Sequence, residues 1–369
     1  MSEYKKPIQK IAVFTRYDRL GASSRLRFYQ FQARLQKHGL QCDFFPLFDD
    51  SYLRVQYLQQ KKSLILIVAS YLRRFMQLCL ILKYDVVWIE KELFPGFPSV
   101  FDKLLSWLRP YVVDYDDAIF HNYDLSRRFW VRLLFKNKID KVMRYAKVVV
   151  VGSPYLLERA KAASAANVQF IPTVIDEEKY ALFTAKIQPV PTPLKDSFVI
   201  GWVGSPATQF YLQELSVVFS ALQKKYSFLQ LHFVGVSRDF KIDGVEHQNI
   251  PWSEQTEVDS IQKFDIGIMP LKNTPWELGK CGYKLIQFMA CGKPVVASRV
   301  GANISIVQPN LGFLCDNNQE WIASLSQFIE NAQLRAQMGE AALRQVQNKY
   351  CIQAVESQLV YIFKNVNQP

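Results

Sequence analysis

Continuous apolar runs alternate with longer stretches of helical periodicity along most of the chain. Such runs are typical of strands buried on both faces of a parallel sheet, and the stretches between them are typical of the helices that cover it. Helices are predicted over residues 24–38, ending at Gly39, and over 154–165. The apolar runs of the first half predict strands at residues 11–17, 42–48, 86–92, 111–117, 147–153 and 168–176.

The same rhythm restarts after a proline-rich segment. Residues 186–197, KIQPVPTPLKDS, contain three prolines and no apolar periodicity, which indicates an extended linker. Two successive β/α series therefore predict an α/β protein of two Rossmann-like domains, residues 1–190 and 191–349, with ligands at the carboxyl ends of the strands. The second series predicts strands at 198–204, 229–235, 264–271 and 293–301, and helices at 208–225, 253–263 and 281–291.

The composition is typical of a folded protein of a reducing compartment. Among its 369 residues, 49% are hydrophobic and 14% aromatic, values that exclude disorder. The six cysteines form no C-x-x-C pair and have no histidine nearby, which argues against a zinc site and against a disulfide framework. The polar start passes directly into a strand-like run, so we expect no signal peptide and a cytoplasmic location.

The net charge of +12 points to an anionic partner. The chain has no nucleic-acid-binding motif, so we expect phosphorylated metabolites or phospholipid rather than nucleic acid. The basic, aromatic stretches 71–83 and 126–147 suit peripheral contact with an anionic inner-membrane surface, and they equally suit ordinary solvated helices. Residues 63–82 are not expected to span a bilayer, because Arg73 and Arg74 would each cost about 2.5–3.5 kcal/mol near its centre.

Residues 264–303 combine features that suit a diphosphate. A buried strand is followed by a loop containing Glu277 and Lys280, and a helix then begins at Tyr283. Lys280, Lys284 and the amino terminus of that helix would gather positive potential and N–H groups at one point. Glu277 is of the type that accepts hydrogen bonds from two sugar hydroxyls at once.

Residues 279–303 also resemble a family signature. They read GKC-x-x-K-x-x-Q-F-M-A-x-G-x-P-V-V-A-S-x-V-G-x-N, which is similar to retaining GT-B glycosyltransferases of family 4, the builders of lipopolysaccharide, capsule and other bacterial glycans. Weaker matches occur in family order at 21–27, 114–120, 200–208 and 265–271.

This resemblance implies a GT-B fold, in which two Rossmann-like domains face a central cleft. It also implies that the amphipathic helix within 350–369 packs back on the first domain. The implied reaction moves a sugar from a nucleotide-diphosphate donor to a hydroxyl of a glycan or lipid-linked acceptor, with retention and with neither metal nor other cofactor.

The chain departs from the family at the donor site. Many members carry two glutamates eight residues apart, where this chain has Gly279 and Gln287, so we expect Glu277 to make the sugar contact. Ser205 and Thr208 stand where an arginine and a lysine are usual. We therefore assign donor binding to a larger set: Gly21, Ser205, Thr208, Lys280, Lys284, Gln287 and Gly301.

Three groups of residues are candidates in the first domain. The stretch GASSRLR follows a strand, and we assign Arg25 and Arg27 to the acceptor, with Ser23 or Ser24 as the alternative of a simple helix cap. Glu90 and Glu92 are further acceptor candidates; one should face the cleft, with Lys91 pointing the other way, because strand side chains alternate.

The third group is DYDDAIFH, residues 114–121. Clustered carboxylates at a strand end could bind a metal, act as acid or base, or orient acceptor hydroxyls. We predict acceptor or sugar contacts from Asp116, Asp117 and His121 and place them, with Glu277, in the catalytic set.

Two other functions remain as rivals. A nucleotide-sugar epimerase of the same fold would turn over free donor without an acceptor. A non-enzymatic binder of anionic ligands would show salt-dependent binding and no affinity for sugar nucleotides.

Overall fold

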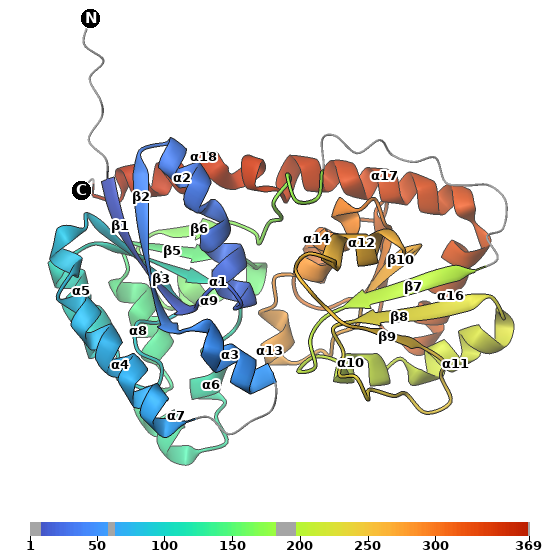
Figure 1. Cartoon of the computed structure of the whole chain (residues 1–369), viewed down its shortest axis with the longest axis horizontal. Coiled ribbons are helices and arrows are strands. Elements are labelled where there is room, and N and C mark those ends of the chain that lie inside the picture. The colour runs from blue at the N-terminus through green and yellow to red at the C-terminus, as the bar shows by residue number, and fades with distance from the viewer. Residues whose placement is uncertain (1–8, 58–62, 182–196, 368–369) are drawn as a thin grey trace, which may run out of the picture. The chain divides into compact units, whose positions relative to one another are not determined.

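The computed structural model describes residues 9–57, 63–181 and 197–367. The chain divides into two compact units, one comprising Met1–Thr173 and Val355–Pro369, and the other Val174–Ala354 (Figure 1). The sequence placed this division at 190/191. The predicted linker, 186–197, lies outside the described residues except for Ser197.

The first unit is built on a parallel six-stranded sheet in the order β2-β1-β3-β4-β5-β6. The central strand β3 is buried along its whole length, as its uninterrupted apolar run predicts. Four predicted strands end early: 86–92 at Glu90, 111–117 at Tyr115, 147–153 at Val151 and 168–176 at Phe170. The strands are β1 (Gln9–Tyr17), β2 (Leu40–Phe48), β3 (Val86–Glu90), β4 (Tyr111–Tyr115), β5 (Val148–Val151) and β6 (Val168–Phe170).

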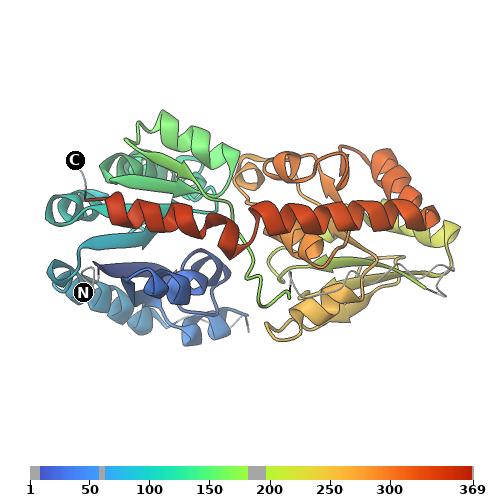
Figure 2. The ribbon, with the colours of Figure 1, turned by 90° about the horizontal axis from the view of Figure 1, so that it is seen from above.

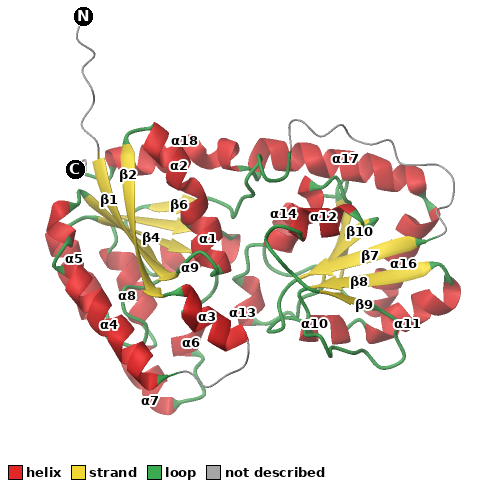
Figure 3. Ribbon diagram, viewed as in Figure 1, coloured by secondary structure: helices red, strands yellow, loops and turns green. Residues whose placement is uncertain are grey.

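Helices lie on both sides of this sheet (Figure 3). The helix predicted over 24–38 is broken at Phe28, whose backbone leaves helical geometry and whose ring centre lies 4.4 Å from that of Trp88. The helices are α1 (Ala22–Arg27), η1 (Tyr29–Phe31), α2 (Gln32–Lys37), α3 (Asp50–Tyr57), α4 (Leu64–Leu78), η2 (Ile81–Lys83), α5 (Val100–Leu108), α6 (His121–Asp124), α7 (Phe129–Phe135), α8 (Lys138–Tyr145) and α9 (Pro154–Ala162).

The second unit repeats the plan with the order β12-β11-β10-β7-β8-β9. The strand order reverses between β7 and β10, which is the point where open α/β sheets bind ligands. The edge strands β9 and β12 were not predicted. The strands are β7 (Phe198–Val203), β8 (Leu229–Val234), β9 (Gln248–Ile250), β10 (Ile266–Met269), β11 (Val295–Ser298) and β12 (Gly312–Cys315).

The helices of the second unit are shorter than the sequence predicts around its site. The predicted helix 208–225 is two helices, and the predicted loop after β10 contains a single helical turn, α13. The helices are α10 (Phe210–Gln213), α11 (Ser216–Lys225), α12 (Glu257–Gln262), α13 (Pro275–Leu278), α14 (Tyr283–Ala290), α15 (Asn303–Ile306), α16 (Asn318–Glu330) and α17 (Ala332–Lys349).

The last helix, α18 (Ile352–Asn365), belongs to the first unit from Val355 onward (Figure 2). The Phe363 ring lies 5.0 Å from that of Trp88 in β3, and its carbonyl accepts a hydrogen bond from Gln9. Glu356 lies 2.7 Å from a ring nitrogen of His38. These contacts make α18 a covering helix of the first sheet.

Segment 63–82 contains α4, which has 15 residues. Within the described ranges, no helix has both the length and the apolar character needed to cross a bilayer.

Candidate functional site

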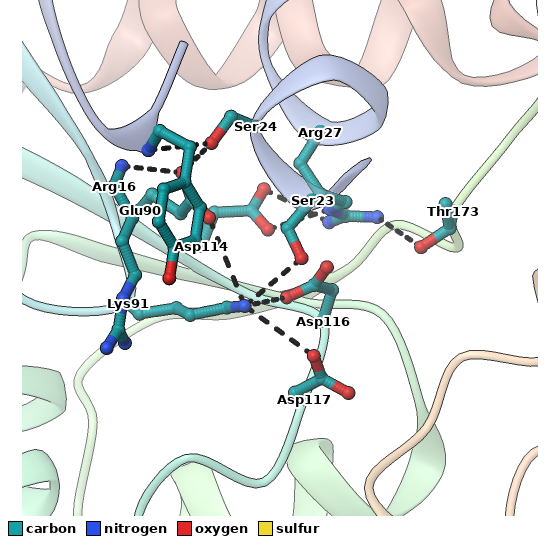
Figure 4. A network of polar contacts seen from close by, with 11 residues as sticks. Arg16, Ser23, Ser24, Arg27, Glu90, Lys91, Asp114, Asp116, Asp117 and Thr173 are labelled. Atoms are coloured by element: carbon teal, nitrogen blue, oxygen red, sulfur yellow. Dashed lines mark hydrogen bonds and ion pairs between the residues drawn. The ribbon is translucent and has the colours of Figure 1, made fainter. Parts of the chain in front are cut away.

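In the first unit, charged side chains converge where β1, β3 and β4 end and α1 begins (Figure 4). All these strands are parallel, so their carboxyl ends meet at one edge of the sheet. The cluster consists of Arg16, Ser23, Ser24, Glu90, Lys91, Asp116 and Asp117.

Glu90 lies at the buried base of this cluster. One carboxylate oxygen accepts hydrogen bonds from the Ser24 hydroxyl (2.6 Å) and from the backbone N–H of Arg16 (2.8 Å). The other oxygen is buried and has no hydrogen-bond partner in the described structure. Burial raises the pKa of Glu90, although Lys91 opposes the effect.

Lys91 is the cation that pairs with the carboxylates of the cluster, and the prediction that it points away from Glu90 was wrong. β3 ends at Glu90, and Lys91 adopts a left-handed backbone conformation (φ 67°) that redirects its side chain. Its ammonium lies 2.8 Å from Asp116, 3.6 Å from Asp117 and 3.2 Å from the Ser23 hydroxyl.

These contacts decide the charge states. Burial by itself would lower the pKa of Lys91, but Asp116, Asp117 and Glu90 outweigh it and raise that pKa. In turn, Lys91 overcomes the effect of burial on Asp116 and lowers its pKa. The cluster therefore holds a charged Lys91 beside an ionised Asp116 at neutral pH.

Asp117 is the carboxylate of this group that solvent reaches best. Its side chain is 27% exposed, compared with 14% for Asp116 and 1% for Glu90. A hydroxyl-bearing ligand would therefore meet Asp117 first, with Asp116 and Lys91 behind it.

Arg27, predicted to contact the acceptor, is a buried structural residue. Its guanidinium pairs with both oxygens of Asp114 at 2.8 and 3.0 Å and donates to the carbonyl of Ile171. Burial raises the pKa of Asp114 to about 6, although Arg27 opposes this. Arg25 is only half-buried and donates to the carbonyl of Arg19, within its own loop.

Glu92, the other predicted acceptor residue, is also engaged inside the fold. Its carboxylate accepts a hydrogen bond from Tyr123 (2.7 Å) and pairs closely with Lys138. Glu92 and Lys138 are both buried. An uncompensated charge here would be costly, so the pair must be kept together and is not available to a substrate.

His121 was predicted to be catalytic, and the structure gives it a different set of contacts. One ring nitrogen lies 2.8 Å from Asp124, and the other lies 2.8 Å from the hydroxyl of Tyr155. With both nitrogens already paired, the imidazole fixes α6 against α9 and has no nitrogen left for a reacting group.

Gly21 caps α1 through its backbone alone, without a side-chain hydrogen bond. The alternative that Ser23 or Ser24 caps this helix is therefore wrong. Ser24 instead accepts from the backbone N–H of Tyr17 (3.1 Å) while donating to Glu90, so it joins β1, α1 and β3.

In the second unit, Lys280 and Lys284 flank the beginning of α14. Gly282 caps this helix in the left-handed conformation and without a side-chain hydrogen bond, so no side chain competes for the N–H groups of its first turn. The Lys284 ammonium lies 4.4 Å from the centre of the Trp202 ring. Burial, with a contribution from Lys280, lowers the pKa of Lys284 to about 7.

Glu277 lies in α13, the short turn before these lysines, and is buried. The hydroxyl of Tyr211 donates to one of its oxygens at 2.5 Å, and Thr274 donates to the other. The carboxylate is thus held in one orientation by two donors. Tyr211 was not identified from the sequence, because 66 residues separate it from Glu277.

Gly301 lies directly against this turn. It has a φ of 54°, and a Cβ there would come within 2.8 Å of the Leu278 carbonyl oxygen and 3.2 Å of that of Glu277. Any side chain at this position would therefore push α13 and its carboxylate out of place. The role of Gly301 is to allow this close approach.

The remaining donor candidates have mainly structural contacts. Ser205 and Thr208 close a turn on each other, since the Thr208 hydroxyl accepts from the Ser205 N–H and donates to its carbonyl. Gln287 is buried and donates to the Tyr180 hydroxyl at 2.9 Å and to Glu257. Its amide serves the packing of α14, so the prediction that it binds the donor is not supported by its contacts.

A cavity of about 270 Å³ opens beside this site within the second unit. Tyr211, the donor to Glu277, forms part of its wall, together with Ser298 and Asn273. In the part of the chain that the structure describes, no three His, Cys, Asp or Glu side chains gather as metal ligands.

Comparison with known proteins gives a family match that includes this second site. Residues 197–331 match the model of the family Glycosyl transferases group 1, and this segment contains the signature at 279–303. A Bacillus subtilis (strain 168) protein named as a teichuronic acid biosynthesis glycosyltransferase, TuaH, is 26% identical over 236 residues. The match covers 58% of this chain and 56% of that relative, so the chain spans about half its length.

Solved structures resemble the chain over nearly its whole length. Sucrose-phosphate synthase from Thermosynechococcus elongatus has a TM-score of 0.68 at 14% identity, covering 97% of this chain and 99% of its own. Anabaena Alr3699/HepE, in complex with UDP-glucose, has a TM-score of 0.67 at 16% identity, covering 96% and 99%. The similarity confirms the predicted GT-B fold.

Proposed function

We propose that the protein is a glycosyltransferase that moves a sugar from a nucleotide-diphosphate donor to a hydroxyl of a glycan or lipid-linked acceptor. The observation that carries this proposal is the arrangement of Glu277, Lys280 and Lys284 around the start of α14, within the segment that matches the glycosyltransferase family. The teichuronic acid relative supports an acceptor in bacterial surface polysaccharide synthesis, such as capsule, O-antigen or lipopolysaccharide.

The main requirement of this reaction is to stabilise the negative charge that develops on the leaving diphosphate. Lys280 and Lys284, together with the N–H groups at the start of α14, supply positive potential where that charge develops. Diphosphate binding would favour the protonated form of Lys284, whose pKa in the free protein is about 7. In the free protein, the charges of Lys280 and Lys284 repel each other. A bound diphosphate would relieve this repulsion.

Glu277 is suited to hold the donor sugar. Its two oxygens are oriented by Tyr211 and Thr274, and each oxygen keeps a second lone pair for a sugar hydroxyl. In the first unit, Asp117 and Asp116 are suited to accept hydrogen bonds from an acceptor hydroxyl, with Lys91 holding both in place.

The family resemblance implies that the anomeric configuration of the sugar is retained. Retention in turn suggests a specific path for the proton of the acceptor hydroxyl. The bond from the anomeric carbon to the phosphate oxygen breaks, and the bond to the acceptor oxygen forms on the same face. The acceptor proton passes to the departing phosphate oxygen. This route requires no covalent sugar–enzyme intermediate.

The test is transfer of labelled sugar from a panel of nucleotide-diphosphate sugars to lipid and polysaccharide fractions of a bacterial envelope, without added metal. UDP-glucose is the first donor to try, because the Anabaena structure contains it. We expect a product with the donor's anomeric configuration and stoichiometric release of nucleoside diphosphate. Conversion of the donor to a free epimer without an acceptor, or no consumption of any donor, would overturn the proposal.

A further inference from the structure

The first unit carries a large apolar surface that its own fold leaves uncovered. Of the 24 large hydrophobic side chains exposed in the described residues, 19 lie between Leu64 and Leu134. Among the most exposed are Ile65 (80%), Trp107 (70%) and Trp130 (69%). Isolated exposed hydrophobic residues are normal, but 15 of these 19 lie in the three helices α4, α5 and α7, and such a concentration is typical of an interaction surface.

α7 shows the pattern most clearly. It reads FWVRLLF, and none of its residues is buried. Because none of its side chains is buried, packing within the fold contributes little to the stability of this helix. Phe129, Leu133 and Leu134 are each more than half exposed, so its apolar side faces solvent.

Contacts between side chains join the three helices into one surface. Phe75 of α4 lies 6.5 Å from Phe101 of α5, ring centre to ring centre. Tyr71 of α4 lies 5.4 Å from Phe97 in the loop before α5. The same loop donates a hydrogen bond from Gly96 to Tyr123, whose ring lies 6.0 Å from that of Phe135 in α7.

The charged residues of this surface have one sign. The sequence contains no Asp or Glu in residues 63–84, 103–113 or 125–139, and Asp102 in α5 is buried. The exposed cations beside the apolar side chains are Lys83, Lys103, Arg127, Arg128 and Lys136.

We propose that the exposed face of α4, α5 and α7 docks on an anionic phospholipid surface. Trp, Phe and Leu side chains flanked by Lys and Arg are what inserts into the headgroup region of such a surface. A second copy of this chain fits less well, because a two-fold contact would bring the same cations against each other. The inference concerns a surface and does not depend on the proposed transfer reaction.

Arg74 shows how α4 would lie on the lipid. Its side chain is 2% exposed and donates to the backbone carbonyls of Thr15 and Phe45, so it points into the protein. Arg73 likewise donates to the carbonyl of Leu47. The arginine pair of the basic stretch 71–83 therefore anchors α4 to the sheet, and the opposite, apolar face of α4 is the one presented.

The test is co-sedimentation of the full chain with vesicles of phosphatidylcholine, with and without phosphatidylglycerol. We expect binding to the phosphatidylglycerol vesicles that weakens with salt, and a blue shift of tryptophan emission from Trp107 and Trp130. The double variant W107S/W130S should lower the partition coefficient about tenfold or more. The matched control V217S/Y361S changes two side chains that are similarly exposed elsewhere and should bind as the unchanged protein does.

Three results would overturn the proposal. The first is no binding to phosphatidylglycerol vesicles at low salt. The second is unchanged binding by W107S/W130S when its melting temperature shows that it is folded. The third is a dimer in sedimentation equilibrium that the same double variant dissociates, since the occupant would then be a second copy of the chain.

Discussion

Lys91 and Lys284 are the same chemical group under opposite electrostatic conditions. Lys91 lies among Asp116, Asp117 and Glu90, which raise its pKa in spite of burial. Lys284 lies near Lys280 over an aromatic ring, and burial lowers its pKa to about 7. The first lysine is a fixed structural cation, whereas the second is suited to gain its charge when an anion arrives.

Replacing Lys91 with methionine should destabilise the protein substantially. The buried Glu90 and half-buried Asp116 would lose their cation, and breaking such a pair costs about 3–5 kcal/mol. Urea unfolding measures the difference. Lys161→Met is the control, because its ion pair with Glu158 is exposed and should contribute about 0–1 kcal/mol. Equal losses in the two variants would show that Lys91 does not neutralise the cluster.

Donor binding should take up a proton near pH 8. Lys284 is then mostly neutral in the free protein because its pKa is about 7, and a bound diphosphate favours the ammonium form. Affinity should therefore fall as the pH rises above 7. Calorimetry of a nucleotide sugar in buffers of different ionisation enthalpy measures the uptake. Lys284→Met should bind more weakly and without uptake; unchanged affinity in that variant would contradict the assignment.

Asp117→Asn should impair transfer while leaving donor binding intact. A hydrogen bond to a charged group contributes about 1.5–3 kcal/mol, so we expect kcat/KM for the acceptor to fall roughly 10- to 150-fold. Steady-state transfer rates at saturating donor give this value. Asp239→Asn, an exposed carboxylate of the second unit, is the matched control. A loss of nucleotide affinity in Asp117→Asn would argue against an acceptor role.

The sequence could identify polar residues near strand ends but not which of them are already paired. Arg27 meets Asp114 across 87 positions, Glu92 meets Lys138 across 46, and His121 meets Tyr155 across 34. Each of these residues has a type and a sequence position that suit a functional site. Only the folded structure shows that each side chain is already bound to a partner within the protein. For Lys91 the missing information was local, since the strand was predicted two residues too long.

At the scale of elements, α13 packs closely against the loop that contains Gly301, and this packing sets the position of Glu277. Gly301→Ala should destabilise the protein by more than the about 1–2 kcal/mol expected from its positive φ alone, because the new methyl meets the Leu278 carbonyl. Donor affinity should fall as well. Thermal unfolding and nucleotide binding are the measurements.

Gly244→Ala separates the two causes. Gly244 has a φ of 70°, but a Cβ there has no atom within 4 Å. Gly244→Ala should lose only the stability that a positive φ costs, about 1–2 kcal/mol, and its donor affinity should not change. If Gly301→Ala behaves in the same way as Gly244→Ala, the loop does not position α13.

The long apolar runs made the two sheets predictable, and the short elements were not. β9 has three residues and lacks a hydrophobic run, with the sequence QNI, so periodicity could not detect it. At the break, Phe28 packs against Trp88, which is distant in the sequence, and local propensity does not encode this contact. By contrast, α14 matches its prediction because its start at Gly282 and its stop near Gly292 are both local signals.

At the scale of the whole molecule, charge and exposed hydrophobicity are unevenly distributed along the chain. The net charge of +12 coexists with stretches of the first unit that have no acidic residue, and most exposed large hydrophobic side chains lie in the same region. The second unit instead places two cations, Lys280 and Lys284, at the start of α14. The positive charge of the chain thus serves two separate proposed interactions: an anionic metabolite with the second unit, and an anionic membrane surface with the first unit.

We expect the second unit to bind a nucleotide-diphosphate sugar through Glu277, Lys280 and Lys284. The most direct test of this binding is a thermal-shift screen of the folded protein against UDP, GDP, ADP, dTDP and CMP and their common sugars, without metal. A donor at 100 times its dissociation constant should stabilise the fold by about 2.7 kcal/mol, and Lys284→Met should lose this shift. No stabilisation by any nucleotide, with a normal unfolding transition, would contradict this expectation.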